Sequence, residues 1–380
     1  MLRLLLLLTL PVLSLSMTGD VAPSPALRDQ VIAAYASTAA SSYREAADTA
    51  RVLLDRVKAL VAAPDEATLA AAREAWCAAR RPYEATEVYR YGDGPIDRKR
   101  GGVENFVNAW PVDENYIEPA ERPARTGIIA DRSRYPVLAR AVLREHNQRG
   151  GETNVCTGWH AIEFMLWGRD TSETGPGDRP ASDFVSGTTP HAERRREYLL
   201  EITTMLHEDL QGVAAAWQPG PGSHREKFVS DPARALRAMF IGPALLTGFE
   251  MAGERLAVAL ESHDQEEEHS CFSDTTDADF KSDMRGVVTV LRGVEKMTGL
   301  IDLVRSVDAA QAAALEKALD ETVVAVNAMP HPFDASIRAP DTSPQHAAMV
   351  SAMHALERLS EQVSASARAL GVMLPTQPQG

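Results

Sequence analysis

One short segment of the chain leaves no face for water. Gly158-Trp-His-Ala-Ile-Glu-Phe-Met-Leu-Trp-Gly168 has only two residues between its glycines that are not apolar, His160 and Glu163. A helix that is apolar all round is buried, so the segment predicts a central helix. His160 and Glu163 are three positions apart and would lie side by side on that helix. The sequence therefore predicts an imidazole and a carboxylate together inside a core.

Two explanations fit this pair. A carboxylate is almost never fully buried unless it is paired or bound to a metal. His160 could simply donate a hydrogen bond to Glu163 and stiffen the core, or the two side chains could belong to a ligand site. Other polar residues that converge on the same place would favour the ligand site.

Apolar residues recur three or four positions apart along most of the chain. This spacing predicts a long first helix from Val31 to Leu60 and a second helix from Leu69 to Tyr91. Further helices are predicted near 198–217, 244–261, 278–298, 308–328 and 345–370. Because no segment shows the alternating pattern of a strand, we expect an all-α fold.

The chain also shows signs of two halves. Pro219-Gly-Pro-Gly222 is the best candidate for a joint, which predicts one helical bundle over 27–218 and a second over 223–371. Tyr83-Glu84 in the first half and Phe249-Glu250 in the second each lie in a helix followed by an acidic loop. This weak duplication predicts two related bundles, with the site near their junction.

The first 16 residues are predicted to be a signal peptide. Met1-Leu-Arg3 gives a basic start, Leu4 to Leu10 an apolar run, and Pro11 ends it before a cleavage site preceding Met17. The apolar run is too short to span a membrane. No cysteine follows closely that could carry a lipid anchor. We therefore expect a periplasmic or secreted protein with no transmembrane segment in the mature chain.

Overall charge and cysteine content exclude several functions. The net charge of −14 repels phosphate backbones and argues against nucleic-acid binding. Cys77, Cys156 and Cys271 lie far apart, so an oxidising compartment permits one disulfide without indicating which pair forms it. No Cys-x-x-Cys-His motif for covalent haem occurs.

A second group of polar residues lies at the end of the second predicted helix. Glu84 and Glu87 are three positions apart, and Glu87 shares a helical stripe with Trp76 and Tyr83. Glu87 should therefore point inward. The alternative is a surface glutamate pair with Arg80 or Arg90 as partners, which suits Glu84 better than Glu87.

These residues could hold a metal ion. His160, Glu163, Glu87 and Glu84 would offer one imidazole nitrogen and several carboxylate oxygens from different helices, a set that suits iron, manganese or zinc. We expect His160, Glu163 and Glu87 to converge. Residues expected as a further ligand or as supporting contacts are Asp97, Arg90, Trp159, Trp167, Glu250 and His269.

A zinc peptidase motif is incomplete. The inverted zincin motif needs a second histidine directly after its glutamate, but Phe164 follows Glu163. No Gly-x-Ser-x-Gly elbow or Gly-rich phosphate loop is present either. The pattern indicates a metal site without a recognised hydrolytic apparatus.

Five blocks, in order along the chain, resemble the imelysin family of exported bacterial proteins. The central block is the Gly-x-His-x-x-Glu motif, which matches Gly158 to Glu163, and the resemblance covers about residues 27–371. The other blocks are Arg81-Pro-Tyr-Glu-Ala-Thr-Glu87 with Gly94-Pro-Ile-Asp97, Asn108-Ala-Trp-Pro-Val-Asp-Glu114, Gly248-Phe-Glu-Met-Ala-Gly-Glu-Arg255 and Glu268-His-Ser-Cys-Phe-Ser-Asp274.

The resemblance implies two related helical bundles and a role in iron acquisition. It also implies a metal site around His160, Glu163 and the acidic residues of Tyr83 to Glu87. We therefore expect an exported protein that binds iron, or an iron-containing ligand, together with a membrane uptake partner; zinc and manganese are alternative metals. The rival functions are a metal-dependent peptidase and a metal-free scaffold for a peptide or partner protein.

Overall fold

The computed structural model describes residues 23–92, 94–120, 126–172, 175–295 and 297–375, and the predicted signal peptide lies outside them. Every regular element in the described part of the chain is helical. The predicted all-α fold is therefore confirmed. None of the described helices is both long and apolar enough to cross a membrane. Cys77, Cys156 and Cys271 are all free thiols.

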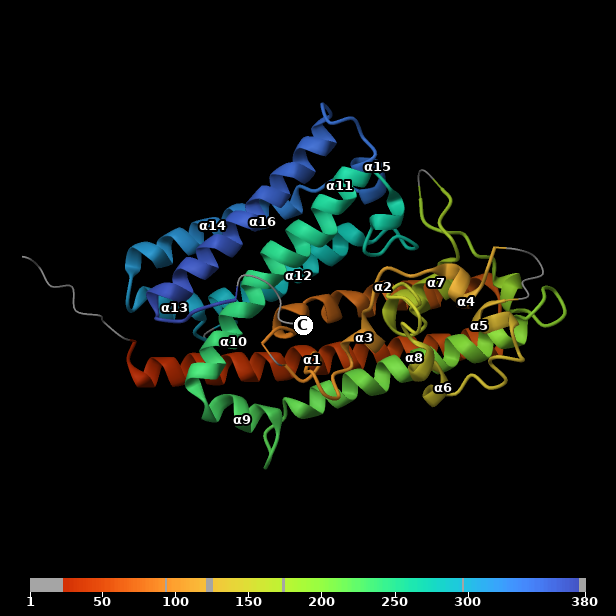
Figure 1. Cartoon of the computed structure of the whole chain (residues 1–380), viewed down its shortest axis with the longest axis horizontal. Helices are drawn as coiled ribbons and strands as arrows, with labels where there is room; N and C mark the ends of the chain where they lie inside the picture. Colours follow the sequence, from red (N-terminus) through yellow and green to blue (C-terminus); the bar gives the residue numbers. More distant parts are fainter. Residues whose placement is uncertain (1–22, 93, 121–125, 173–174, 296, 376–380) are drawn as a thin grey trace, which may run out of the picture.

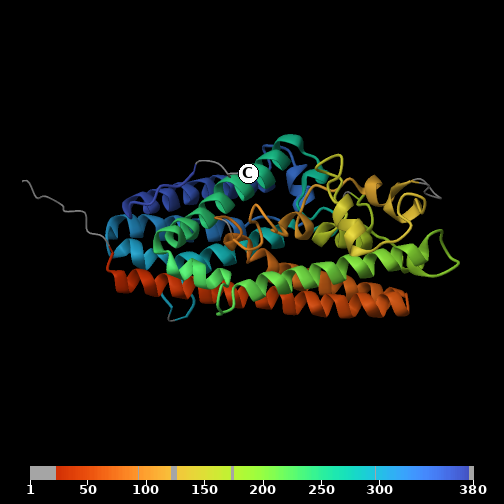
Figure 2. The same ribbon diagram turned by 60° about the horizontal axis from the view of Figure 1, so that its bottom comes forward.

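Three long helices form one side of the molecule. They are α1 (Pro25–Ala62), α2 (Glu66–Glu84) and α8 (Ala192–Ala216), and both views show α1 and α8 running side by side (Figures 1 and 2). Alanine makes up much of the buried face of α1, which lets α2 and α8 approach closely. Asp65 caps α2 through a reciprocal pair of hydrogen bonds with Thr68, which fixes where that helix begins.

The predicted central helix is α7 (Gly158–Trp167), and all ten of its residues are buried. It packs against α2 and α8. Its first residue, Gly158, has a φ of +86°, and a Cβ there would lie 2.3 Å from the carbonyl oxygen of Val107. Only glycine fits this conformation at this distance, so the chain can enter the core helix directly from the loop beside Val107.

The second predicted helix ends earlier than expected. It stops at Glu84, and the short 3₁₀ turn η1 (Glu87–Tyr89) follows instead of a continuous helix to Tyr91. At this point Ala85 packs against α12 (Thr276–Arg292), where a Cβ on Gly286 would lie 2.4 Å from the Ala85 carbonyl oxygen. This contact between residues far apart in the sequence lies where the helix ends.

A single rod crosses α1 in Figure 1 and consists of α10 (Pro232–Leu245), the π-helix η3 (Leu246–Ala257) and α11 (Val258–Ser262). The sequence predicted only its second part, as an ordinary α-helix over 244–261. Pro243 cannot donate the usual hydrogen bond, and the π-helical segment begins three residues later. Long π-helical segments are rare and often occur at functional sites.

The rod packs on α16 (Pro344–Ala369), which in turn pairs with α14 (Ala309–Asn327). Contacts of α10 with α1, and of α12 with α2, join the segments on either side of the predicted joint at 219–222. The division into two related bundles stays a prediction. The remaining elements are α3 (Glu104–Val107), α4 (Glu114–Ile117), α5 (Gly127–Ala130), α6 (Arg140–His146), η2 (Ala181–Phe184), α9 (His224–Ser230), η4 (Gln265–Glu267), α13 (Leu300–Arg305) and α15 (Phe333–Ile337).

Candidate metal centre

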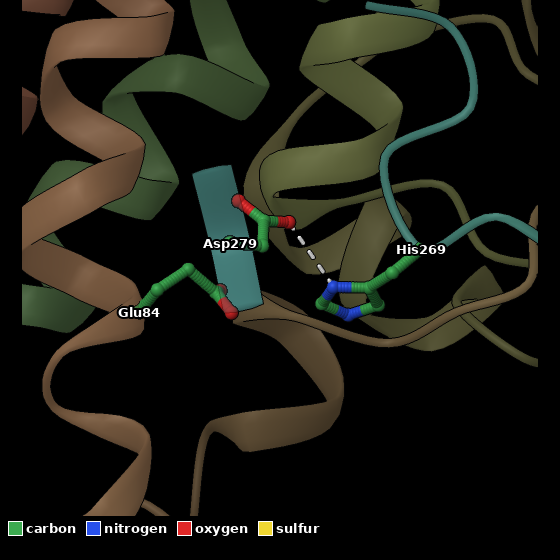
Figure 3. Close-up of side chains that lie close together, drawn as sticks. All are labelled: Glu84, His269 and Asp279. Carbon is green, nitrogen blue, oxygen red and sulfur yellow. Dashed lines mark hydrogen bonds and ion pairs between the residues drawn. The ribbon is translucent and has the colours of Figure 1, made fainter. Parts of the chain in front are cut away.

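Three buried side chains from distant parts of the sequence meet between α2 and α12. Figure 3 shows Glu84, His269 and Asp279 pointing toward one another. Each offers one possible ligand atom, and these atoms all lie within 4.8 Å of one another. Two carboxylates and one imidazole form a donor set that suits iron, manganese or zinc. We call these three residues the acidic triad.

The local sequence explains how the triad is placed. Asp279 lies one helical turn before Asp283 on the buried face of α12, which continues through Val287. His269 lies in the loop before α12. The hydroxyl of Ser270 donates to Oδ2 of Asp279 at 2.7 Å and so fastens this loop to the helix. The histidine reaches the triad because the loop is anchored at the residue beside it.

Arg80 supplies the positive charge at the centre of the triad. Its Nη2 atom lies 3.0 Å from Oε1 of Glu84, 3.2 Å from Oδ2 of Asp279 and 3.3 Å from Nδ1 of His269. The same nitrogen lies 3.3 Å from Nε2 of His160. The guanidinium thus contacts all three side chains of the triad. It is held there by the rings of Trp76, Tyr83 and Trp159, at 5.7–5.8 Å.

His160 and Glu163 form the expected buried hydrogen bond, with Nδ1 of His160 3.0 Å from Oε2 of Glu163. The other carboxylate oxygen accepts from the backbone N–H of Ser273 at 2.9 Å and from its hydroxyl at 2.6 Å. Glu163 therefore anchors the 269–274 loop and orients His160. With Nδ1 used for Glu163, Nε2 of His160 faces Arg80 and accepts from it. A carboxylate behind an imidazole in this manner is a common support for a metal-binding histidine.

Glu87 is buried, as its position on the stripe predicts, but its partners are different from those expected. Its Oε1 accepts from the Tyr83 hydroxyl at 2.9 Å, and its Oε2 lies 3.3 Å from Arg90 and 3.6 Å from Arg255. Within the described residues, none of its hydrogen bonds or ion pairs reaches His160 or Glu163. Glu87 therefore belongs to a group of ion pairs beside the triad. We call this group, which consists of Arg90, Arg255 and their carboxylate partners Glu87, Asp97 and Glu250, the arginine network.

The other predicted supporting residues divide between two places. Trp159 packs on Arg80, and Trp167 packs edge-on against Trp76. Asp97, Arg90 and Glu250 lie farther from the triad, in the same arginine network as Glu87. Asp97 pairs with Arg90 at 3.2 Å, and Glu250 pairs with Arg255 at 3.2 Å.

Sequence reasoning missed four residues of this centre: Arg80, Asp279, Asp283 and Arg255. Arg255 is buried in η3, and its Nη1 lies 2.9 Å from Asp283 and 3.3 Å from Glu84. A signal was present for two of the four. Asp279 and Asp283 are polar residues four apart on the apolar stripe of a predicted helix, which is the same kind of pattern that marked His160 and Glu163.

Carboxylates outnumber arginines in this buried region. Arg80 and Arg255 together form ion pairs with five carboxylates, Glu84, Glu87, Glu250, Asp279 and Asp283. In the described structure Asp283 Oδ1 accepts no hydrogen bond, while Glu84 Oε1 lies 3.0 Å from Nη2 of Arg80. A surplus of buried carboxylates with an open acceptor atom can accommodate a further cation.

The protonation of the centre reflects this surplus. Burial raises the pKa of Glu84 to about 8, although Arg80 and Arg255 both act to lower it. Burial also raises the pKa of Asp283, and the neighbouring Glu84 adds to the effect. Burial and Arg80 hold the pKa of His160 well below its usual value, and burial and Arg255 do the same for His269. Both imidazoles are therefore neutral, the state that binds metals.

Comparison with known proteins identifies relatives over most of the chain. Iron-regulated protein A of Synechococcus elongatus is 24% identical over 262 residues, which cover 66% of this chain and 60% of that protein. A crystal structure of a protein from Parabacteroides distasonis, assigned as an iron-regulated protein A precursor, superposes with a TM-score of 0.70. The superposed residues make up 92% of this chain and 96% of the Parabacteroides distasonis chain, at 17% sequence identity, which shows a shared fold.

The sequence profile of the imelysin family, also designated peptidase M75, matches residues 39–363. This match includes Glu84, His160, His269 and Asp279. Since it spans most of the 380 residues, the chain belongs to the imelysin family.

Proposed function

We propose that this protein is exported and binds iron at the acidic triad as part of iron uptake. The observation that carries the proposal is the surplus of buried carboxylates around Arg80 and Arg255, with Asp283 Oδ1 accepting no hydrogen bond in the described structure. The names of the relatives, iron-regulated protein A, support iron as the metal. Zinc and manganese suit the same donors and are the alternative metals.

Four side chains would hold the ion: Glu84, His269 and Asp279 of the triad, with His160 offering Nε2. Glu163 would act behind them, since its carboxylate is already engaged by His160 and Ser273. A metal ion brings its own positive charge, so it competes with the Arg80 guanidinium for the same oxygens and nitrogens.

Export rests on two further observations. The first 16 residues have the pattern of a cleaved signal peptide. The structural relative from Parabacteroides distasonis is named as a precursor. A periplasmic or secreted location, and a membrane partner that takes up the metal or an iron-containing ligand, would follow from such a role.

The geometry gives less support to a peptidase. A metal-bound water needs a carboxylate nearby that is free to accept its proton. Glu163 and Glu87 are the two glutamates that could act as such a base. Glu163 accepts three hydrogen bonds from His160 and Ser273, and Glu87 contacts Tyr83, Arg90 and Arg255. A metal-free scaffold remains the stronger rival, because Arg80 already supplies a cation to the triad.

Thermal melts with and without added Fe²⁺ test the proposal. The variants are His160→Ala and His269→Ala, and the matched control is His354→Ala. His354 bonds Glu357 three residues later, at 2.9 Å, in the same His-x-x-Glu spacing as the buried pair, but both side chains are exposed. A ligand that binds only the folded state at 100 times its dissociation constant adds about 2.7 kcal/mol of stability.

We expect wild type and His354→Ala to gain stability with Fe²⁺, and the two buried-histidine variants to stay folded without gaining it. His160→Ala should remain folded because Glu163 keeps both hydrogen bonds from Ser273. Metal analysis of protein purified from its native export compartment identifies the bound ion. If wild type ignores Fe²⁺, Mn²⁺ and Zn²⁺ alike, while His160→Ala melts far lower than wild type, the buried pair is structural and the proposal fails.

A further inference from the structure

A cavity of about 730 Å³ is lined in part by three residues of the arginine network, Arg90, Asp97 and Glu250. One wall is formed by residues 90–92 and 97–99 in the loop after η1, and the other by α10 and the start of η3. Gly92, with a φ of +85°, brings this loop onto α10, where a Cβ would lie 2.8 Å from that of Ala238. The volume is typical of sites for small organic ligands. None of the triad residues lines the cavity.

The lining is strongly basic, although the whole chain carries a net charge of −14. Among the described lining residues, two are carboxylates, Asp97 and Glu250, and five are cationic. The five are Arg90, Arg98, Lys99, Arg234 and Arg237. A concave surface lined by one sign of charge focuses the electrostatic field and raises the local concentration of oppositely charged ligands.

Both carboxylates of the lining are already neutralised by neighbours. Asp97 pairs with Arg90 at 3.2 Å. Glu250 pairs with Arg255 at 3.2 Å and accepts from the Tyr91 hydroxyl at 3.1 Å. Burial alone would raise the pKa of Glu250, but Arg255 and Arg90 lower it below its usual value. Neither carboxylate is left to balance the remaining cations.

Two cations on opposite walls are available to a ligand. Lys99 lies on the loop and Arg237 on α10, and both are exposed. Within the described part of the chain neither of them forms an ion pair. An anion bound between the walls would therefore gain charge-assisted hydrogen bonds without breaking existing ones.

The cavity also has an apolar surface. Ile241 and Leu245 form a stripe along α10, and Phe249 extends it on η3 with 38% of its side chain exposed. A large aromatic side chain beside unpaired cations favours a ligand with an apolar body over a bare inorganic anion.

We propose that this cavity binds a small organic anion that carries at least two negative groups on an apolar body. The negative groups contact Lys99 and Arg237 from the two walls, and the body packs on Phe249. The site is separate from the acidic triad and needs no metal, so the proposal stands or falls independently of the proposed iron site.

Isothermal titration with benzene-1,3,5-tricarboxylate, in the presence of a chelator, tests the proposal on the full mature chain. Two further probes separate the features of the ligand. Inorganic phosphate carries only the negative charge, and neutral benzyl alcohol carries only the apolar body. The test variant is Lys99→Glu/Arg237→Glu. The control is Arg56→Glu/Lys58→Glu, which changes the net charge equally at two exposed positions on α1 outside the cavity. A third variant, Phe249→Ser, removes the apolar contact.

We expect one saturable site for the tricarboxylate in wild type and in the α1 control. The cavity double variant should bind at least about tenfold more weakly, since each charge-assisted hydrogen bond alone can contribute about that factor. Phe249→Ser should weaken the tricarboxylate and leave phosphate unchanged. The proposal is overturned if the tricarboxylate does not bind, if both double variants weaken it equally, or if phosphate binds as tightly, which would indicate an adventitious ion only.

Discussion

Nη2 of Arg80 lies 3.2 Å from Oδ2 of Asp279, although the two residues are 199 positions apart and come from α2 and α12. Both side chains are almost completely buried. The same nitrogen lies within hydrogen-bonding distance of Glu84, His160 and His269. An internal guanidinium and an external metal ion would thus compete for one set of donor atoms, and this competition can be measured.

Arg80→Met should raise the affinity for metal while it destabilises the metal-free protein. Removing one partner of a buried ion pair typically costs about 3–5 kcal/mol. Asp279 would lose its arginine partner, and Glu84 would keep only Arg255. The same loss of positive charge makes the triad a better metal site. We expect Fe²⁺ to bind at least about tenfold more tightly than in wild type, measured by titration calorimetry.

Arg305→Met is the matched control for that substitution. Arg305 also pairs with two carboxylates, Asp302 and Glu316, but on the surface. Exposed pairs contribute at most about 1 kcal/mol, so this variant should change neither stability nor metal affinity appreciably. If Arg80→Met binds metal more weakly than wild type, the arginine is part of the binding site and not its competitor.

Gly158, the first residue of the central helix α7, should not tolerate substitution by a residue with a side chain. Gly158→Ala would place a Cβ 2.3 Å from the Val107 carbonyl oxygen at a φ of +86°. Strain and overpacking together should lower the free energy of unfolding by about 2–5 kcal/mol. Gly212→Ala on α8 has no neighbour within 4 Å and should instead raise it by about 0.5–1 kcal/mol. Urea unfolding of both variants measures the two opposite effects.

Asp274 should make the protein less stable as pH rises. Its two carboxylate oxygens are buried without a hydrogen bond in the described structure. Burial, with Asp170 and Asp334 nearby, raises its pKa from 3.8 to about 7. The folded state therefore holds this proton more tightly than the unfolded state, and stability falls as pH rises from about 4 to about 7. Asp274→Asn removes this loss and should raise the Tm at pH 8 by about 2–4 °C, with no gain at pH 4.

Asp131→Asn provides a control of opposite sign. The hydroxyl of Ser133, with backbone N–H groups, lowers the pKa of the exposed Asp131. Its contribution is present above its unfolded pKa and is lost in acid, so the amide should be slightly destabilising at pH 8. Equal effects of the two substitutions at pH 8 would contradict the assignment of Asp274 as a buried carboxylate with a raised pKa.

The fold was largely predictable because helical spacing and burial agree along the chain. The ten-residue apolar segment at 158–167 is the buried helix α7, and the spacing over 31–60 marks α1. The predicted end of the second helix was wrong for a tertiary reason, and the π-helical form of the segment after Pro243 was not predicted. Ala85 turns away from α2 where it meets Gly286, and the rod after Pro243 continues as a π-helix. The contact of Ala85 with Gly286 joins residues that are far apart in the sequence, so the spacing of neighbouring residues does not predict it.

The candidate site was predictable only in part. The burial of His160 and Glu163 was evident from their apolar neighbours, and the exposed pair His354 and Glu357 shows that spacing alone would not have indicated it. Arg80 was considered only as a partner for a surface glutamate. Its central place depends on loops and helices that are brought together by the fold, and sequence spacing carries no information on such long-range convergence.

Anomalous diffraction from crystals loaded with Fe²⁺ tests the central claim most directly. We predict one strong peak at the iron edge, within coordination distance of Glu84, His269 and Asp279, with Arg80 turned away from them. Absence of any peak at the triad, with the Arg80 guanidinium still in contact with Asp279, would contradict the account and leave this cluster as a metal-free structural network.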